Sequence, residues 1–364
     1  MSSEKYFVDA DITKAETLPA PFYHDAGVFE RMKEEVFVKS WQWIGDQATL
    51  LPLDSYAHPI ELLENYLNEP LVLVRDGDQL RCLSNVCTHR GNIVVHDPGK
   101  FKTLSCLYHG RRFGLDGSYQ HMSEFKETKN FPRDCDHLHS FQLKEWGPFL
   151  FTGLEPEVDF SVIKNFLDKW VGFLPLKEFK YDASKSRDYL VNCHWALYCD
   201  NYLEGFHIPF VHPELNSVLD YNSYDSVLFE YGTLQIGFAG GAEETYTLPP
   251  GHPLYGKEVA AFYFWIFPNT TFSFYPWGVS VNQVKPVALN RTKVTFRNYI
   301  YDEDKYGSTA GPLMDKVERE DEFVVEGVYK GLRSRYYKTG RFSPTREQGV
   351  HHFHRMLAAR CSKI

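Results

Sequence analysis

Two short segments of the chain each pair a cysteine with a histidine. Residues 87–89 read CTH and residues 106–109 read CLYH, so each segment offers one thiolate and one imidazole. Such a set suits tetrahedral zinc, and it also suits a Rieske [2Fe–2S] cluster, in which two cysteines hold one iron and two histidines hold the other. Zinc fingers usually present both cysteines before both histidines, whereas here the two types alternate. The alternation favours the cluster, and structural zinc remains the alternative. The predicted cluster ligands are Cys87, His89, Cys106 and His109.

A second group of metal-binding residue types lies in the segment HWALYCDNYLEGFHIPFVHP. Asp200, Glu204 and His207 are spaced i, i+4 and i+7, so a helix would place them on one stripe. Pro209 disfavours continuing that helix, which would let His212 turn back toward His207. Two histidines and one carboxylate form the facial triad of non-haem Fe(II) oxygenases. The alternative, two ordinary partly buried histidines, is less attractive in a chain that also carries a candidate iron–sulfur cluster.

The carboxylate of this triad is expected on a later helix, MDKVEREDEFVVEGVYKGL. Asp321 falls within the apolar stripe of that helix, whereas Glu320 and Glu322 are predicted to point away from it. A carboxylate on a buried face is costly unless it is paired or bound to metal. Asp321 is therefore the predicted third iron ligand, and a buried ion pair with Arg333 or Arg335 is the alternative. The stripe consists of Val317, Val324, Val328 and Leu332.

The charge balance of the chain restricts its partners. Its 364 residues include 39 basic and 48 acidic side chains, for a formal charge of −9. Nucleic acids and anionic membranes select basic surfaces, so we expect neither as a partner. The N-terminal segment has no secretory pattern, and no apolar run reaches the roughly 18 residues of a membrane span. Seven cysteines do not form a closed disulfide set, so we expect a reducing, cytoplasmic location.

The elements that must position these residues divide into two kinds. From residue 70 to 155, short apolar strands alternate with turns, and Asp-Gly pairs at 76–77 and 116–117 predict tight hairpins. After residue 186 a strand leads to a helix near 195–208, and a long aromatic β region follows. Helices near 311–337 and 346–360 end the chain.

This pattern predicts an α+β protein with two domains. A small all-β domain, residues 38–155, would carry the cluster. A larger domain, residues 1–37 and 156–364, would carry the mononuclear iron on an antiparallel sheet and its long C-terminal helix.

The combined motifs resemble the α-subunit of a Rieske non-haem iron oxygenase over nearly the whole chain. They are C-x-H with C-x-x-H at 87–109, D-N-x-x-E-x-x-H-x-x-x-x-H at 200–212, and the late Asp321. The resemblance implies that the larger domain is a helix-grip fold and that His207, His212 and Asp321 bind iron. It implies that Glu204 bridges the iron site to the Rieske histidine of a neighbouring subunit. Asp200 is a further candidate catalytic residue.

The same resemblance implies a reaction and partners. One or both atoms of O2 would enter a small organic substrate, and the cluster would supply electrons to the mononuclear Fe(II). A homotrimer is implied, because electrons cross between neighbouring subunits in this family. The chain contains no G-x-G-x-x-G fingerprint and no plant-type C-x₄-C-x₂-C, so a separate flavin or iron–sulfur reductase must supply electrons from NAD(P)H.

The sequence constrains the substrate less than it constrains the cofactors. The segments DNYLEGFHIPFVHPEL and GLRSRYYKTGRFSPTREQGVHHFHR are most similar to oxygenases of quaternary amines such as choline, betaine or carnitine, which would be hydroxylated or N-dealkylated. A trimethylammonium group needs an aromatic box, and the same aromatic side chains could instead form hydrophobic core or hold an aromatic ring, as in ring-hydroxylating dioxygenases. The candidates are Tyr263, Trp265, Phe272, Phe274, Tyr275 and Trp277.

An alternative function and one remaining histidine cluster also need an interpretation. A Rieske electron carrier without oxygenase activity would need only about 100 residues, which would leave most of this chain unexplained. The cluster HHFH at 351–354 is expected to have a structural or interface role rather than to bind metal.

Overall fold

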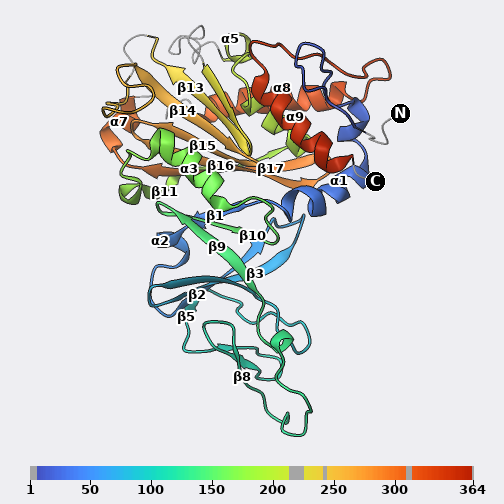
Figure 1. Ribbon diagram of the computed structural model, residues 1–364, viewed down its shortest axis with the longest axis vertical. Coiled ribbons are helices and arrows are strands. Elements are labelled where there is room, and N and C mark those ends of the chain that lie inside the picture. The colour runs from blue at the N-terminus through green and yellow to red at the C-terminus, as the bar shows by residue number, and fades with distance from the viewer. Residues whose placement is uncertain (1–5, 213–224, 241–243, 309–313, 363–364) are drawn as a thin grey trace. The chain divides into compact units, whose positions relative to one another are not determined.

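The structure is a computed structural model that describes residues 6–212, 225–240, 244–308 and 314–362. Its chain forms two compact units (Figure 1). The smaller unit is a single segment, Trp41–Pro156, whereas the larger unit combines Met1–Ser40 with Glu157–Ile364. The chain therefore begins in the larger unit, forms the smaller one, and returns.

The smaller unit is built on two antiparallel sheets. A seven-stranded sheet has the order β1-β10-β9-β4-β3-β2-β5, and a three-stranded sheet has the order β6-β7-β8. The large sheet comprises β1 (Gln42–Asp46), β2 (Tyr56–Leu62), β3 (Glu69–Asp76), β4 (Gln79–Ser84), β5 (Gly99–Lys100), β9 (Ser140–Trp146) and β10 (Phe149–Gly153). The small sheet comprises β6 (Leu104–Ser105), β7 (Arg112–Phe113) and β8 (Tyr119–His121). The unit also contains the short helices α2 (Gln47–Leu50), after β1, and η3 (Asp134–Asp136), before β9.

Both predicted hairpins are present in this unit. Gly77 connects β3 to β4 with φ of 60°, and Gly117 connects β7 to β8 with φ of 84°. Only glycine adopts such left-handed angles at no steric cost, which is why the Asp-Gly signal works. One hydrophobic cluster of the unit includes both Cys87 and Cys106, so the core of the unit anchors the two predicted ligand loops.

The larger unit contains a seven-stranded antiparallel sheet of order β11-β17-β16-β15-β14-β13-β12. Apart from the return from β11 to β12, the strands follow one another by hairpins, as an aromatic and β-branched sequence favours. The strands are β11 (Lys180–Val191), β12 (Asp225–Phe229), β13 (Gly232–Phe238), β14 (Val259–Ile266), β15 (Thr270–Tyr275), β16 (Gly278–Ala288) and β17 (Arg291–Ile300).

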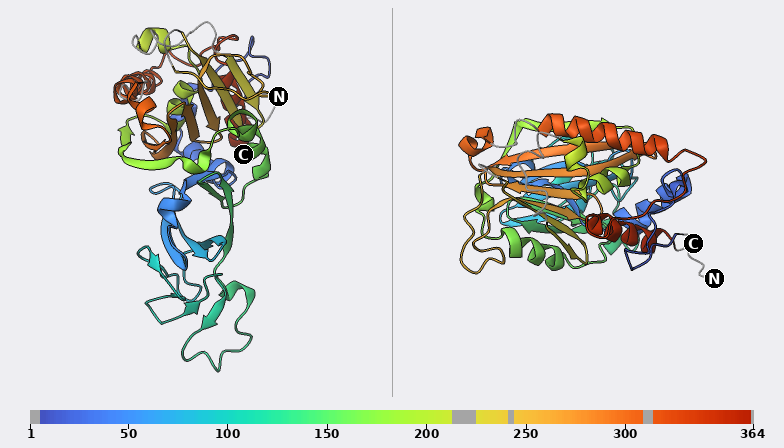
Figure 2. Two further views of the ribbon diagram at one scale, coloured as in Figure 1. Left: turned by 90° about the vertical axis from the view of Figure 1, so that its left-hand side faces the viewer. Right: turned by 90° about the horizontal axis from the view of Figure 1, so that it is seen from above.

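Helices cover both faces of this sheet, with α8 along one face and α3 along the other (Figure 2). The α+β prediction is therefore confirmed. The helices are α1 (Ala26–Met32), α3 (Phe160–Val171), α4 (Trp195–Tyr202), α5 (Ile208–Val211), α7 (Glu303–Ser308), α8 (Met314–Gly331) and α9 (Gln348–Cys361), with the short turns η1 (Ala20–Tyr23), η2 (Lys33–Phe37) and η4 (Leu176–Glu178).

The aromatic residues of the β region do not form one box. Successive side chains of a strand point to opposite faces, so Phe264 contacts Phe166 of α3 while Trp265 contacts Phe353 of α9. Phe272 and Phe274 lie on the face of Phe264, since they are its direct and diagonal cross-strand neighbours. The six predicted box residues are therefore divided between the two faces of the sheet.

The helices differ from their expected bounds. The helix predicted near 195–208 ends at Tyr202, and a separate single turn, α5, follows. The long helix is also shorter than 311–337, because α8 spans Met314–Gly331. Both differences bear on how the metal-binding side chains are positioned.

Candidate functional site

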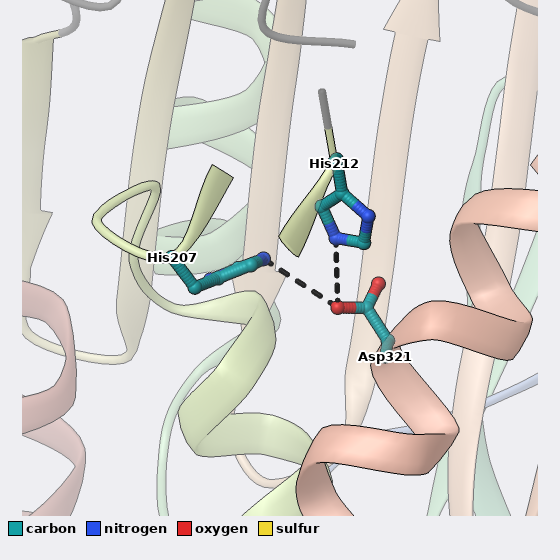
Figure 3. A group of neighbouring side chains, drawn as sticks. All are labelled: His207, His212 and Asp321. Carbon is teal, nitrogen blue, oxygen red and sulfur yellow. Dashed lines mark hydrogen bonds and ion pairs between the residues drawn. The ribbon is translucent and has the colours of Figure 1, made fainter. Parts of the chain in front are cut away.

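His207, His212 and Asp321 lie together in the larger unit (Figure 3). Each offers one ligand atom, and the three atoms lie within 4.8 Å of one another. Asp321 Oδ1 is 3.0 Å from His212 Nε2 and 3.5 Å from His207 Nε2. Two imidazole nitrogens and one carboxylate oxygen converge on a single point, which is the donor set that non-haem Fe(II) prefers.

The local sequence explains how the two histidines approach each other. The Glu204 carboxylate accepts hydrogen bonds from the backbone N–H groups of Phe206 and His207. This side-chain cap competes with the helix and reverses the chain after α4. The turn of α5 then carries His212 back, so that the two imidazole centroids are 5.2 Å apart.

A glutamate fixes each imidazole. Glu204 Oε1 is 2.7 Å from His207 Nδ1, and Glu320 Oε2 is 2.7 Å from His212 Nδ1. A carboxylate at Nδ1 keeps the proton on that nitrogen and leaves the Nε2 lone pair for a metal. Both Nε2 atoms face Asp321, so the two histidines are held in the metal-binding tautomer.

Glu320 corrects the expectation from the helical pattern. Its carboxylate reaches His212 rather than pointing away, and one oxygen of Glu322 is buried. The fully buried positions of α8 include Glu318 and Val325, whereas Val328 is 45% exposed. The buried stripe of α8 is thus displaced from the predicted one. The buried Glu318 carboxylate is satisfied by Tyr198 of α4, whose hydroxyl donates to it at 2.6 Å.

We call His207, His212 and Asp321, with the side chains that contact them, the metal group. Asn201 also belongs to this group, although the sequence did not predict it. Its side-chain amide donates to Asp321 Oδ1 at 3.0 Å. The bond holds the oxygen that faces both histidines. The sequence does contain an indication, because Asn201 is the asparagine of the D-N-x-x-E motif. An amide side chain beside two acids nevertheless gave no separate reason to predict a role for Asn201 in the site.

Asp200 is not one of the three residues whose ligand atoms lie together, although it lines the same cavity as His207. His354 of α9 lies with Nε2 3.0 Å from Asp200 Oδ1, and Tyr23 donates to Oδ2 at 3.4 Å. The Leu18 N–H donates to His354 Nδ1, so the His354 proton is on Nε2 and points to Asp200. Asp200 therefore anchors α4 to the N-terminal segment and to α9. His351 and His352 contact the backbone carbonyls of other segments, in keeping with a structural role for the HHFH cluster.

The electrostatics of the metal group favour a cation. Burial opposes protonation of His212, but hydrogen bonds and charge from Asp321 and Glu320 outweigh it and raise the pKa of His212 above its usual 6.5. Three carboxylates (Glu204, Glu320 and Asp321) surround two imidazoles. A divalent metal would replace the proton and offset two of these three negative charges.

A cavity of about 240 Å³ lies beside His207 on the side of Glu204. Its lining combines acids with the apolar side chains of α8 and α9. Burial raises the pKa of one of these acids, Glu347, and the nearby charges of Glu204 and Asp200 add to the rise. The lining includes Asp200, Glu204, Val328, Tyr337, Glu347 and Val350.

In the smaller unit, the two predicted ligand loops have the same backbone conformation. The Gly91 N–H donates to the Cys87 carbonyl, and the Gly110 N–H donates to the Cys106 carbonyl. Both glycines have φ of 71°, which closes each loop four residues after its cysteine. The two loops are thus equivalent turns, each presenting a cysteine and a histidine.

The side chains of these loops have the arrangement that a Rieske cluster needs. Both cysteines are buried, and their thiols interact with each other. The imidazoles of His89 and His109 lie together, with ring centroids 4.8 Å apart. Two sulfurs on the inside and two nitrogens nearer the surface match a [2Fe–2S] pair in which each iron has one kind of ligand.

The environments of the two cysteines shift their thiol pKa values in opposite directions. Burial raises the pKa of Cys87. It acts in the same sense on Cys106, but hydrogen bonds from the Tyr108 backbone and the Asn92 side chain outweigh it and lower the pKa of Cys106. Asn92 Nδ2 lies 3.6 Å from the Cys106 sulfur.

Comparison with known proteins agrees with this geometry. Residues 176–363 match the family model for the ring hydroxylating alpha subunit (catalytic domain), and residues 40–132 match the Rieske [2Fe-2S] domain. The first match alone spans more than half of the chain. This chain belongs to the Rieske-type ring-hydroxylating oxygenase α-subunits. The α-subunit is an oxidoreductase with a Rieske cluster and a mononuclear iron, and the donor sets described above fit both groups.

Individual relatives of this α-subunit cover nearly its whole length. The carnitine monooxygenase oxygenase subunit of Escherichia coli K12 is 31% identical over 96% of this chain and 95% of its own. Choline monooxygenase of Beta vulgaris is 28% identical over 93% of this chain and 75% of its own.

Solved structures share the fold of the α-subunit. A quaternary ammonium Rieske monooxygenase in complex with L-carnitine has a TM-score of 0.77 at 23% identity, covering 97% of both chains. Naphthalene 1,2-dioxygenase with bound indole has a TM-score of 0.74 at 15% identity, covering 100% of this chain and 95% of its own.

Within the described residues, no helix is long and apolar enough to cross a membrane.

Proposed function

We propose that this α-subunit is the terminal oxygenase of a quaternary-amine monooxygenase. The observation that carries the proposal is the near full-length similarity to carnitine and choline monooxygenases. One oxygen atom of O2 would enter a C–H bond of the amine, and the other would leave as water. NAD(P)H would supply the two electrons through a separate reductase, with one proton taken from solvent.

Three aromatic side chains remain together as candidates for recognising the ammonium group. The rings of Tyr263 and Tyr275 lie 5.8 Å apart, and Tyr275 stacks on Trp277 at 5.1 Å. Tyr263 pairs across the sheet with Ser273, whose hydroxyl contacts Tyr202 of α4. This row therefore faces the helix that also carries Asn201 of the metal group. Aromatic faces attract quaternary ammonium ions.

The test is substrate-dependent NADH oxidation with a surrogate reductase, followed by product identification. The panel contains carnitine, choline and glycine betaine, with 3,3-dimethyl-1-butanol as the neutral isostere of choline and naphthalene as the aromatic competitor. We expect turnover of at least one amine and no turnover of the isostere. One ¹⁸O atom from ¹⁸O2 should appear in the product when any aldehyde is reduced to the alcohol with borohydride before its oxygen exchanges with water. Oxidation of naphthalene with two labelled atoms would instead assign the alternative, an aromatic-ring dioxygenase.

We also propose the roles of the site residues. His207, His212 and Asp321 would hold the mononuclear iron, with Glu204 and Glu320 orienting the imidazoles. Cys87 and Cys106 would hold one iron of the cluster, and His89 and His109 the other. Metal and acid-labile sulfide analysis tests both assignments, because the two centres together predict three irons and two sulfides per chain. Two irons per chain would contradict the mononuclear site, and zinc without sulfide would contradict the cluster.

The tip of the ligand loops suggests how subunits would assemble. Leu107 is 78% exposed and Tyr108 is 58% exposed, although both are hydrophobic and adjoin His109. The cavity beside Glu204 offers apolar and acidic side chains to such a tip. We propose a homotrimer in which this tip docks onto the Glu204 surface of a neighbouring copy, so that electrons pass between subunits. A cytoplasmic location is part of this proposal, since it depends on reduced thiols and NAD(P)H.

A charge placed on the tip tests this assembly. Leu107→Glu would bring a carboxylate against Glu204 and Glu347 of the neighbour, and we expect at least a tenfold loss of turnover with an unchanged cluster spectrum. Leu53→Glu is the matched control, because Leu53 is exposed in the same unit but remote in sequence from the ligand loops. Sedimentation velocity gives the oligomeric state of each variant. Unchanged turnover of the Leu107 variant, or a monomeric active protein, would contradict the proposed docking.

A further inference from the structure

The smaller unit contains a buried arginine next to the predicted cluster. Arg111 follows His109 by two residues and is 1% exposed. A guanidinium remains charged at any ordinary pH, and burying it is costly unless it is paired and hydrogen-bonded. Neither of the cluster's loops needs such a group for ligation, so its position calls for a reason of its own.

Arg111 joins the two ligand loops. Its Nη1 donates to the Thr88 hydroxyl at 2.7 Å, and Thr88 lies between Cys87 and His89 in the other loop. The Thr88 hydroxyl in turn donates to the backbone carbonyl of Asp136 at 2.8 Å. Arg111 Nη2 donates to the Asp136 carboxylate at 3.3 Å. The guanidinium therefore ties both loops to the segment η3.

Aromatic rings cover the guanidinium. The rings of Phe131, Tyr119 and Phe125 lie 5.1, 5.3 and 5.6 Å from the Arg111 Cζ atom. The Phe125 ring also contacts the imidazole of His89, at 5.5 Å between centroids. One ring thus separates the charge from a ligand of the cluster. Aromatic packing excludes water, so the field of the charge is weakly screened along this path.

The carboxylate opposite this charge is shared. Asp136 accepts from Arg111 through Oδ1 and from the Arg133 side chain through Oδ2, at 3.3 Å in each case. One negative charge therefore faces two positive charges. Arg133 has 66% of its side chain exposed and is screened by water, whereas Arg111 is not. Thr88 lies between two predicted ligands and contacts the Arg111 guanidinium, but it contacts only the backbone carbonyl of Asp136. The positive partner of the buried pair therefore lies nearer the predicted cluster than the negative one.

We propose that the Arg111–Asp136 pair sets the reduction potential of the Rieske cluster. The oxidised cluster accepts one electron from the reductase and gains one negative charge. Arg111 stabilises that added charge and raises the potential, while Asp136 opposes it and lowers the potential. The pair is thus a positioning element for the two loops and an electrostatic control of electron uptake, beyond the oxygenation reaction itself.

Substitutions at the two positions should move the potential in opposite directions. Redox titration of the holoprotein, followed by its electron paramagnetic resonance signal, measures the potential. For Arg111→Gln we expect about a tenfold decrease in the equilibrium constant for reduction, which is ~59 mV for one electron. For Asp136→Asn we expect an increase, and for Arg111→Lys, which keeps the charge but not the paired guanidinium contacts, a smaller decrease than for the Gln variant.

Arg133→Gln is the matched control. It also removes a positive charge that is paired with Asp136, but at an exposed position. Its shift should be less than half that of Arg111→Gln. If Arg111→Gln does not retain a cluster, the opposed shifts of Asp136→Asn and Arg111→Lys relative to the wild type decide the proposal. A purely structural role predicts weaker thermal stability and cluster loss without opposite shifts. Shifts of the same sign at Arg111 and Asp136, or unchanged potentials, would overturn the electrostatic role.

Discussion

Glu320 offers the most direct test of how the metal site is built. Its carboxylate lies 2.7 Å from His212 Nδ1 and is 28% exposed, so solvent screens it only in part. Loss of the partner that orients a metal-ligating histidine typically lowers metal affinity by about 10- to 100-fold. For Glu320→Ala we therefore expect a loss of ~1.4–2.7 kcal/mol in metal binding.

The substitution Glu320→Gln separates charge from orientation. The amide oxygen of the introduced glutamine can still accept the Nδ1 proton of His212, but a charge-assisted hydrogen bond is roughly twice as strong as a neutral one. Glu320→Gln should therefore lose about tenfold or less in affinity. Both affinities would be measured by anaerobic competition between the protein and a chelator for Fe(II), after removal of the mononuclear metal only.

Glu322→Gln supplies the control on the same helix. The Glu322 carboxylate pairs with Arg319 at 3.1 Å, and no described contact joins it to the ligand histidines. We expect its metal affinity to stay within about twofold of the wild type, and the visible spectrum of the cluster to be unchanged in every variant. Wild-type affinity in Glu320→Ala would refute the assigned role of Glu320.

Three other predictions concern the same site. Asp321→Ala should lose mononuclear iron and turnover while keeping the cluster spectrum, as metal analysis can check against Asp304→Ala, an exposed acid of α7; retained activity would exclude Asp321 as a ligand. Glu204→Gln should lose no more metal affinity than Glu320→Gln, but in iron-saturated protein it should slow single-turnover reoxidation of the cluster at least tenfold, and an unchanged rate would rule out the bridging role. Despite burial, Asp321 and Glu320 raise the pKa of His212 above 6.5, so metal affinity should fall about tenfold per pH unit below the raised pKa. The same shift stabilises the metal-free fold below pH 6.5, and this stability should decrease as the pH rises through the raised value, as chemical denaturation at several pH values can measure.

The sequence predicted which residues the structure brings together where the prediction depended on short-range spacing. The cysteine–histidine loops and the pair His207 and His212 each lie within a few residues, so residue type and turn signals sufficed to place them. Asp321 was also predicted locally, from its position between Val317 and Val324 on one stripe of the helix, and the structure places it beside both histidines. These assignments needed no knowledge of which elements pack together.

The parts that were missed depend on contacts between distant segments. Val328 was predicted to be buried and is exposed, because the buried stripe of α8 runs through Glu318, Val325 and Tyr329 instead. The burial of Glu318 depends on its contact with Tyr198 of a distant helix, α4, which the local pattern does not show. Glu320 was assigned to solvent for the same reason. The prediction of a helix through residue 208 was wrong for a different reason, which is local. The Glu204 side chain accepts a hydrogen bond from the His207 backbone N–H, and this contact favours a turn over a continued helix.

The charge of the metal group provides an argument about substrate that does not depend on relatives. Glu204, Glu320 and Asp321 carry three negative charges, and the two imidazoles are neutral when they bind a metal. A ferrous ion contributes two positive charges. Lys316 lies 4.0 Å from Glu320, but its side chain is 52% exposed and is screened by water, so the occupied site keeps an excess of negative charge. In a partly buried site, such an excess attracts a cation and gives a neutral hydrocarbon no advantage. The contrast between choline and its neutral isostere therefore tests the electrostatics of this site directly, and naphthalene, which has no charge to recognise, is the less suitable substrate.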